Sequence, residues 1–431
     1  MPRYELAGDR FWEVTRTGAT LTIVSGKLGN PGRTTTKAAA DDEAAEALCE
    51  HLIEEMEKRG YQAVVPGAPK PAKPASKAEQ RNPELKAAIA KDPEDPAAYS
   101  VYADWLQGVG ELRGELIAAQ IAADARDSAK AKAAADELLE RHAWYFLGPL
   151  AHDPALALSW HNGFLHRAEL VEHHAAQGTR GRSLEALLAH PSARFLVALA
   201  ANIDRTDAAG MLDVLARMAP PSLRQLELFS RCELPDLGAV WQRCHSLHQF
   251  ELAAHSFGCG RIVLPHVRRA RFLCTALGGR STRQIAGASW PELERLDIYF
   301  GEGSATFDDV KPLLARSDLP KLTHLKLRGA SFVGQICRAL PASPLAKQLV
   351  ALDLSKGELA DADDLAVLAA HRFERLKELA LPVTLAYART IAPVEKLAKT
   401  VTGDEKIGGD HTINQLMYEE ADDEYFEGVQ E

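Results

Sequence analysis

The chain has 431 residues, of which 46% are hydrophobic, so two or three domains with buried cores are expected. It has no run of 18 apolar residues, no apolar leader and only six scattered cysteines, which argues against a membrane-spanning, exported or disulfide-stapled protein and indicates a reduced, cytoplasmic one. The net charge of −10 is concentrated in residues 402–431, where ten acidic residues and one lysine give −9, so the rest is nearly neutral and a generally basic nucleic-acid binder is excluded.

Residues 1–65 are predicted to form a small α/β unit. Aromatic and β-branched residues from Tyr4 to Arg16 and from Thr20 to Val24 flank a Thr17-Gly18 turn, a pattern typical of a β-hairpin. A further strand is predicted at 34–37, after a loop rich in glycine. A helix is predicted at 41–59, because its first turn is acidic, its last residues are basic and a glycine follows.

The same unit resembles a WGR domain, a small module found in some poly(ADP-ribose) polymerases and in many bacterial proteins. The resemblance rests on Phe11-Trp12-Glu13-Val14, on Gly26-Lys27-Leu28-Gly29-x-Pro31-Gly32, and on Lys58-Arg59-Gly60-Tyr61 after the helix. In the polymerases, the Trp and Arg of the tripeptide that names the family help to contact DNA. Here that tripeptide is Ser25-Gly26-Lys27, so the stacking ring and the guanidinium are replaced.

A linker and a helical region follow. Residues 66–81 contain four prolines and several basic residues, which favour an extended, solvated spacer. Residues 82–142 are predicted to be helical, with Pro83 in the first turn of one helix and Ser128 as the N-cap of another. The run from Asn82 to Gln120 resembles the bacterial repeat-companion domain, which implies leucine-rich-like repeats downstream and assigns no activity.

Residues 143–398 are predicted to form a repeat array. The pattern apolar-x-x-apolar-x-apolar occurs seven times with starts 20 to 29 residues apart, a period typical of solenoids. The copies begin at Leu223, Leu247, Val267, Leu293, Leu322, Leu349 and Leu376, and a weaker copy begins at Leu196. Residues 144–195 are expected to cap the array, and a return helix is predicted at 361–371. The array resembles leucine-rich-repeat proteins, so the fold class is α/β with a solenoid.

The solenoid is predicted to bind a protein through the outward side chains of its strands. Positions between and before the last two apolar residues of each copy point away from the core. The expected contact residues are Glu227, Glu251, Arg269, Arg271, Arg295, Asp297, Lys326 and Asp353, with Tyr299 and Phe229 as aromatic anchors. The alternative is that these side chains form a merely solvated face.

Residues 399–431 are predicted to be an acidic, disordered tail. One hypothesis is that the tail docks on Arg268, Arg269 and Arg271 of its own solenoid. Another is that it presents Tyr418, Tyr425 and Phe426 to a partner or a modifying enzyme, which would make the chain a substrate or carrier. The third is a free tail that keeps the protein soluble.

No catalytic or metal-binding motif stands out. Seven Cys and His residues lie between positions 244 and 274, but none of them forms the close Cys-x-x-Cys pair that is typical of zinc sites. Neither a Gly-x-Ser-x-Gly motif nor a P-loop occurs. We therefore expect no enzyme activity, no cofactor, no metal and no small-molecule substrate.

The leading functional prediction is a non-enzymatic scaffold that binds a protein partner. A nucleic-acid-associated regulator is the main alternative, because residues 1–40 carry six basic and three acidic residues. The expected phosphate contacts are Arg10, Arg16, Lys27, Arg33 and Lys37.

Overall fold

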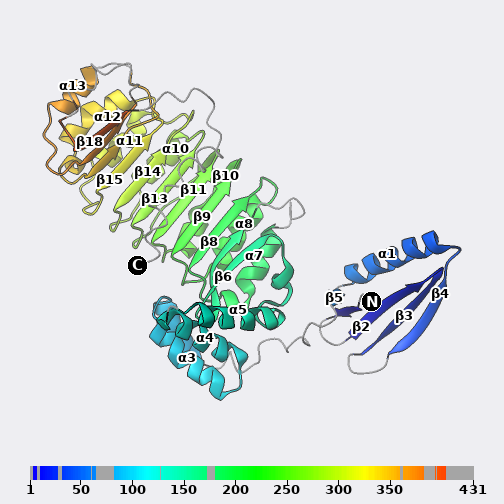
Figure 1. The fold of residues 1–431 in the computed structure, drawn as a ribbon. Helices are drawn as coiled ribbons and strands as arrows, with labels where there is room; N and C mark the ends of the chain where they lie inside the picture. Colours follow the sequence, from blue (N-terminus) through cyan, green and yellow to red (C-terminus); the bar gives the residue numbers. More distant parts are fainter. Residues whose placement is uncertain are drawn as a thin grey trace. The chain divides into compact units, whose positions relative to one another are not determined.

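The structure is a computed structural model that describes residues 3–6, 10–27, 32–59, 61–64, 82–126, 128–171, 180–359, 363–382, 394 and 396–403. It is a mixed α/β structure with a large sheet (Figure 1). Its contacts group the chain into two compact units. One consists of Met1–Asn82 and Ala103–Ala151, and the other of Pro83–Tyr102 and His152–Glu431.

The N-terminal module is an antiparallel sheet with one helix on it. The strand order is β4-β3-β2-β1-β5. The elements are β1 (Arg3–Leu6), β2 (Arg10–Thr17), β3 (Thr20–Lys27), β4 (Arg33–Ala38), α1 (Asp42–Lys58) and β5 (Gln62–Val64). Gly18 has a positive φ of 60° in the β2–β3 turn, a conformation that glycine adopts without strain. The predicted strand at 34–37 and the predicted helix lie where the sequence placed them, and the turn at Gly18 joins β2 to β3. The first arm of the predicted hairpin, residues 4–16, instead forms two antiparallel strands, β1 and β2.

The core of this module lies between α1 and one face of the sheet. Tyr4, Trp12, Val14, Leu21 and Ile23 are buried there against apolar side chains of the helix. The rings of Tyr4 and Trp12 meet edge to face with centroids 5.6 Å apart. Residues alternate between the two faces of a strand, so Arg10 and Arg16 of β2 lie on the same face as Trp12 and Val14.

The region predicted to be helical is helical. Its elements are α2 (Pro83–Lys91), α3 (Pro96–Gly108), α4 (Leu112–Arg126), α5 (Ala129–Arg141), α6 (Ala143–Leu147) and the 3-10 turn η1 (Gly148–His152). Gly114 lets α4 approach α3 closely, since a Cβ there would lie 2.7 Å from the Ala103 carbonyl oxygen. Ser128 is the N-cap residue of α5, as predicted, although its hydroxyl forms no capping hydrogen bond.

The second unit contains a sheet of eleven strands among the described residues, in the order β18-β17-β16-β15-β14-β13-β11-β9-β8-β7-β6. The strands are β6 (Leu156–His161), β7 (Phe164–Leu170), β8 (Ala198–Ile203), β9 (Gln225–Ser230), β11 (Gln249–Ala254), β13 (Arg269–Cys274), β14 (Arg295–Tyr299), β15 (His324–Arg328), β16 (Ala351–Asp353), β17 (Glu378–Leu381) and β18 (Thr400–Gly403). Only β6 and β7 are antiparallel neighbours in this part of the chain. The end strands β6 and β18 do not pair, so the described sheet does not close into a barrel.

Helices return the chain between most of these strands and lie along one face of the sheet (Figure 1). They are α7 (Arg180–Ala189), α8 (Ala208–Met218), α9 (Gly238–Arg243), α10 (Gly279–Ala286), α11 (Phe307–Leu314), α12 (Val333–Ala339) and α13 (Asp363–Ala369). Short 3-10 turns are η3 (Pro191–Ala193), η4 (Leu340–Ala342) and η5 (Pro344–Lys347), and β10 (Glu233–Asp236) pairs with β12 (Ser256–Gly258).

The repeated apolar pattern forms a continuous ladder of side chains on the helix-covered face. The ladder runs through Leu226, Phe250, Ala270, Leu296, Leu325, Leu352 and Leu379. All of these side chains are buried. Each additional strand covers the apolar edge of its neighbour, which is the physical reason that the pattern must recur.

Aromatic rings pack against one another at the start of the second unit. Phe164 and Phe195 meet edge to face at 4.8 Å, and Tyr99 and Tyr102 pack against Phe164 at 6.1 and 6.2 Å. Phe164 and Phe195 lie within residues 144–195, which were expected to cap the array. That expectation omitted the tyrosines, because they come from α3, a helix assigned to another domain.

Two predicted boundaries need correction. The array was expected to end at 398, but Thr400–Gly403 adds β18 to the sheet, with Leu379 opposite Val401. The helical region 82–142 was expected to be one domain, but Pro83–Tyr102 groups with the large sheet. The linker prediction at 66–81 and the tail residues from 404 onward lie outside the described residues.

Candidate binding site

The exposed face of the large sheet carries the predicted contact residues in two rows. Cross-strand pairing places Glu227, Glu251, Arg271, Asp297, Lys326 and Asp353 in one row. It places Gln225, Gln249, Arg269, Arg295 and His324 in the row before it. The predicted residues are therefore brought together as lateral neighbours, although they are 20 or more positions apart in the chain.

Much of the charge in the first row is paired internally. The Arg167 guanidinium donates hydrogen bonds of 3.3 and 3.1 Å to the two carboxylate oxygens of Glu227. Arg271 lies 3.3 Å from Glu251 and 3.3 Å from Asp297. Arg328 completes this chain of charges with bonds of 3.2 and 2.8 Å to Asp297.

These paired groups are also largely buried. The side chains of Arg271, Asp297 and Arg328 are 8%, 7% and 4% exposed. Burial raises the pKa of Glu251, and the nearby carboxylates of Glu227 and Asp297 add to the shift, while Arg271 opposes it. Burial is the larger effect, because removal from water disfavours the charged carboxylate. The ion pairs of Arg271 with Glu251 and Asp297 thus contribute to the packing of this face.

An apolar stripe follows the charged row at the ends of the strands. Ala253, Leu273 and Tyr299 are buried together, with Phe229 packed against them. Tyr299 is 6% exposed, so the ring expected to anchor a partner contributes to packing of the face itself. Phe229 is half-buried.

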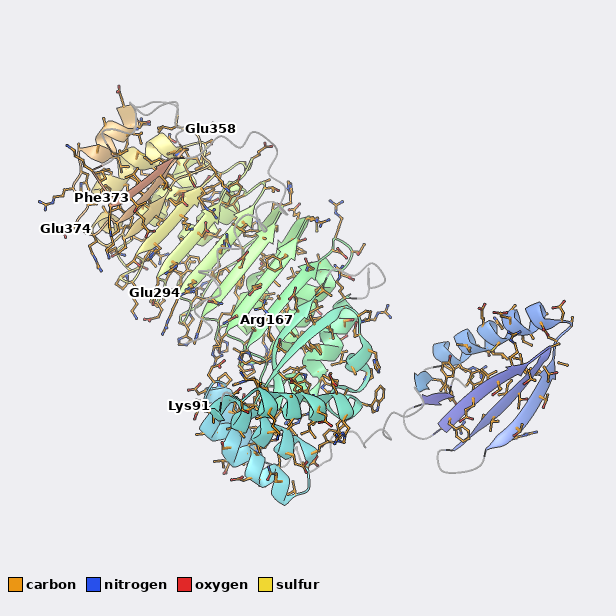
Figure 2. All side chains as sticks on the ribbon, viewed as in Figure 1. Lys91, Arg167, Glu294, Glu358, Phe373 and Glu374 are labelled. Carbon is orange, nitrogen blue, oxygen red and sulfur yellow. The ribbon has the colours of Figure 1, made fainter. Side chains whose placement is uncertain are left out.

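A polar pocket of about 640 Å³ lies at the opposite ends of the strands, where they begin. We call it the strand-start pocket. It is lined by Arg224, Gln225, His248, Gln249, Arg268, Arg269 and Glu294, together with Lys91–Glu94, His166 and Val197. Lys91 at the end of α2 and Glu294 just before β14 are labelled in Figure 2.

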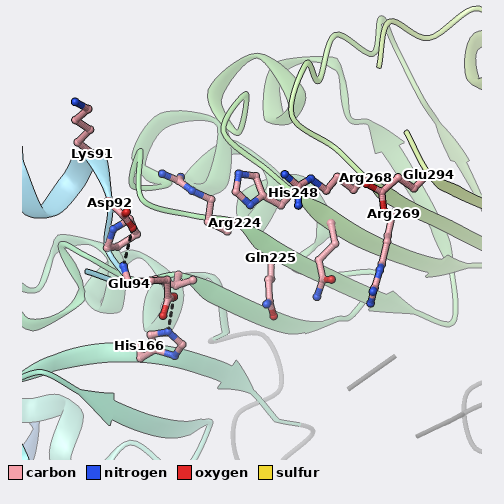
Figure 3. Close-up of a pocket in the computed structure, with 13 residues that line it drawn as sticks. Lys91, Asp92, Glu94, His166, Arg224, Gln225, His248, Arg268, Arg269 and Glu294 are labelled. Carbon is pink, nitrogen blue, oxygen red and sulfur yellow. Dashed lines mark hydrogen bonds and ion pairs between the residues drawn. The ribbon is translucent and has the colours of Figure 1, made fainter. Parts of the chain in front are cut away.

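A backbone ladder fixes the spacing of the pocket. The amide of His248 donates to the Arg224 carbonyl at 2.8 Å, that of Arg268 to His248 at 2.7 Å, and that of Glu294 to Arg268 at 2.8 Å. These residues occupy the same position in consecutive repeats. Their side chains therefore form a row along the edge of the sheet (Figure 3).

The charges of the pocket are mixed, with clustered arginines on the sheet side. Arg224 donates to the carbonyls of Pro221 and Leu223, at 2.8 and 3.3 Å. His248 lies beside Arg224 and Arg268. Burial and the two arginines lower its pKa, so the imidazole is held neutral at neutral pH.

The loop after α2 forms the other wall. Its Glu94 carboxylate lies 2.9 Å from His166 Nε2, and this contact lowers the pKa of Glu94 (Figure 3). The Tyr99 hydroxyl donates to the Pro93 carbonyl at 3.0 Å and holds the loop against the packed rings behind it.

Sequence reasoning missed most of this pocket. It identified Arg269 as a contact and Arg268 as a dock for the tail, but not Arg224, His248 or Glu294. The signal was present, since these residues fill the first variable position of the repeated pattern. It was overlooked because only positions inside the strands were considered.

On the N-terminal module, the predicted phosphate contacts share one face, the one on which α1 packs. Register places Arg10 opposite Lys27, Ser25 opposite Arg33, and Leu21 opposite both Arg16 and Lys37. Arg33 and Lys37 are exposed on the edge strand β4. Arg16 instead donates to the Asp42 carbonyl at 3.1 Å and lies 3.7 Å from Glu46, so it holds the start of α1.

In the described part of the chain, no three His, Cys, Asp or Glu side chains could together hold a metal ion. All six cysteines are free, and burial raises the pKa of the Cys337 thiol to about 12. No described helix has the length and apolar character needed to cross a membrane. Tyr418, Tyr425 and Phe426 lie outside the described residues.

Comparison with known proteins identifies one family. Residues 5–67 match the WGR domain, which confirms the resemblance drawn from the sequence. Comparison with curated proteins gives no match. Among solved structures, a crystal structure of a Bacteroides fragilis protein is similar, with 15% identity and a TM-score of 0.43 over 94% of this chain and 95% of that chain.

Proposed function

We propose that the chain is a non-enzymatic, cytoplasmic scaffold that binds a protein partner through a leucine-rich-repeat-like solenoid. In this proposal, residues 152–403 form the solenoid, together with Pro83–Tyr102 of the region that resembles the companion domain. The observation that carries the proposal is the strand-start pocket, in which equivalent positions of consecutive strands present polar side chains at one edge. Extended rows of this kind suit recognition of a polypeptide.

The proposed contact surface consists of the strand-start pocket and the half-buried side chains Arg295, Lys326 and Asp353. The buried pairs around Asp297 support the surface instead of contacting the partner. A polar rim over a packed layer is typical of protein-binding surfaces.

An affinity pull-down from native cytoplasm tests the proposal. One half of the sample is treated with nuclease, and the double variant Arg268→Glu/Arg269→Glu is compared with Arg372→Glu/Arg375→Glu. Arg372 and Arg375 are exposed residues before β17, outside the pocket, and give the same change in charge. We expect one protein that is retained with nuclease and with the control variant but lost with the pocket variant. Retention by both variants would contradict the proposal.

A second candidate function is association with nucleic acid through the WGR domain. It is favoured by the family match and by the exposed Arg33 and Lys37 on the same sheet face as Arg10 and Lys27. Phosphate contacts dominate such binding and make it salt-dependent.

Duplex DNA binding, followed by fluorescence anisotropy across salt concentrations, tests this candidate. With no more than five phosphate contacts, the slope of log affinity against log salt should be no steeper than about −4.5. Arg33→Glu/Lys37→Glu should weaken binding at least tenfold, whereas Arg372→Glu/Arg375→Glu should not. Equal affinity of the two double variants would exclude the sheet face that carries Arg33 and Lys37 as the DNA contact.

A further inference from the structure

We infer that, when no partner is bound, the strand-start pocket binds a carboxylate-rich polypeptide, and that its occupant is then residues 404–431 of the same chain. The starting observation is a set of arginines that lack acidic partners. Among the described residues, no carboxylate forms an ion pair with Arg268 or Arg269. Arg268 is exposed and Arg269 is half-buried, so both guanidiniums are accessible from the pocket.

The pocket favours spaced carboxylates over a dense phosphate group. Asp92, Glu94 and Glu294 also line it, and they would repel several phosphate charges gathered at one point. An extended acidic chain can place single carboxylates beside the arginines instead. The side-chain amides of Gln225 and Gln249 lie in the same pocket and can pair with a peptide backbone.

The arginine next along β13 does not take part. Arg271 is paired with Glu251 and Asp297 and its side chain is 8% exposed, so it has no free face for another carboxylate. The docking surface is therefore Arg268 and Arg269 at the strand starts, next to Arg224, which already interacts with Asp92 and Glu94. This differs from the set Arg268, Arg269 and Arg271 that the sequence suggests.

The chain supplies a matching ligand within reach. Residues 404–431 contain ten acidic residues and one lysine, and acids alternate with Tyr418, Tyr425 and Phe426. β18 ends at Gly403 and is five strands from β13, a lateral distance of about 24 Å at a strand spacing of about 4.8 Å. Because the pocket lies where the strands begin, the four residues of β18 add about 13 Å along the strand direction. The 13 residues between Gly403 and Met417 span about 20 Å as a flexible chain and more than 40 Å when extended, on the order of that distance or beyond.

Proteolysis of the full chain with a Glu-specific protease tests the inference, with loss of the tail followed by mass spectrometry. Tethering gives an effective concentration of about 1 mM, and a weak site with a Kd of about 0.1 mM would then protect the tail about tenfold. We expect Arg268→Glu/Arg269→Glu, or high salt, to remove that protection. In the control variant Arg372→Glu/Arg375→Glu, the tail should be cleaved at the same rate as in the parent protein. Equal rates for both variants and the parent protein would overturn the inference.

A second measurement guards against a variant that fails to fold. A labelled peptide of residues 404–431 is added to protein that ends at Gly403, which keeps every described strand and helix. We expect binding that is at least tenfold weaker for a peptide with its ten acids changed to amides. Equal binding of the two peptides, or binding to the full chain as strong as to the shortened one, would overturn the inference. No partner is needed, so failure here leaves the proposed function standing.

Discussion

Arg328 and Asp297 form a doubly hydrogen-bonded ion pair on the face of the large sheet that points away from the helices. Nε lies 3.2 Å from Oδ1 and Nη2 lies 2.8 Å from Oδ2. Arg271 lies 3.3 Å from the same carboxylate, so one aspartate balances two buried arginines from neighbouring strands. A residue that sequence reasoning assigned to partner binding is thus part of the framework of the face.

Replacing Asp297 with Asn should strongly destabilise the large sheet. The change leaves two arginines buried with too little negative charge, which typically costs about 3–5 kcal/mol. Urea unfolding followed by circular dichroism measures the loss. Glu378→Gln is the control, because Glu378 is exposed on the same sheet and should change stability by about 0.5 kcal/mol or less. Similar losses in the two variants would show that Asp297 has no special structural role.

The raised pKa of Glu251 predicts a pH dependence of opposite sign to that of most carboxylates. Between the ordinary value of 4.5 and the raised value, the folded state binds more protons than the unfolded chain. The contribution of Glu251 to stability therefore falls as pH rises through this window.

Melting temperatures measured from pH 4 to pH 7 test this expectation. With Glu251→Gln, the fall in melting temperature as pH rises should be smaller than in the parent protein. Glu358→Gln, at an exposed position, should leave the profile unchanged. A parent profile that rises more steeply with pH than that of Glu251→Gln would contradict the assignment.

Close contact between α12 and α13 depends on a glycine. A Cβ at Gly334 would lie 1.9 Å from Asp364 Oδ2, and Arg338 pairs with that same carboxylate. Gly279 and Asp309 repeat the arrangement between α10 and α11, with a Cβ distance of 2.6 Å. The same close contact between a glycine and an aspartate therefore occurs in two pairs of neighbouring helices.

Gly334→Ala should destabilise the protein by about 1–3 kcal/mol, because the carboxylate or the helix must move. Gly210→Ala is the matched control, since a Cβ there meets no atom within 4 Å. That change lies inside α8 and should be neutral or stabilise by about 1 kcal/mol. Thermal unfolding distinguishes the two, and equal shifts would argue against a close contact at Gly334.

The position of β18 predicts where the chain can be shortened. Ending the chain after Gly403 keeps β18, so the melting temperature should fall by no more than the few degrees that loss of the docked tail would cause. Ending it after Ala398 removes the strand and exposes the edge of β17, including Leu379 beside Val401. We expect a loss of about 2 kcal/mol, seen as a lower melting temperature. Equal stability of the two shortened chains would place the end of the folded unit before β18.

Sequence reasoning recovered what short-range patterns encode. The WGR module was found from local motifs, and its hairpin and helix lie where turn and charge signals placed them. The seven apolar patterns all became strand starts and buried ladder positions, because a strand that buries one face needs apolar residues at alternate positions. The charged positions of those strands were correctly expected to face away from the helices.

The tertiary structure decided which of those charges are available. Arg271 and Lys326 occupy the same position in two repeats, yet the first is buried between two carboxylates and the second is half-buried. Partners such as Glu251 and Asp297 come from neighbouring strands, so charge availability depends on cross-strand register and on burial. The strand-start pocket arises in the same way, from residues of successive repeats that are 20 or more positions apart and from a loop after α2. The sequence by itself determined the repeating elements, since those follow from local periodicity, whereas the site depended on lateral packing that no local pattern specifies.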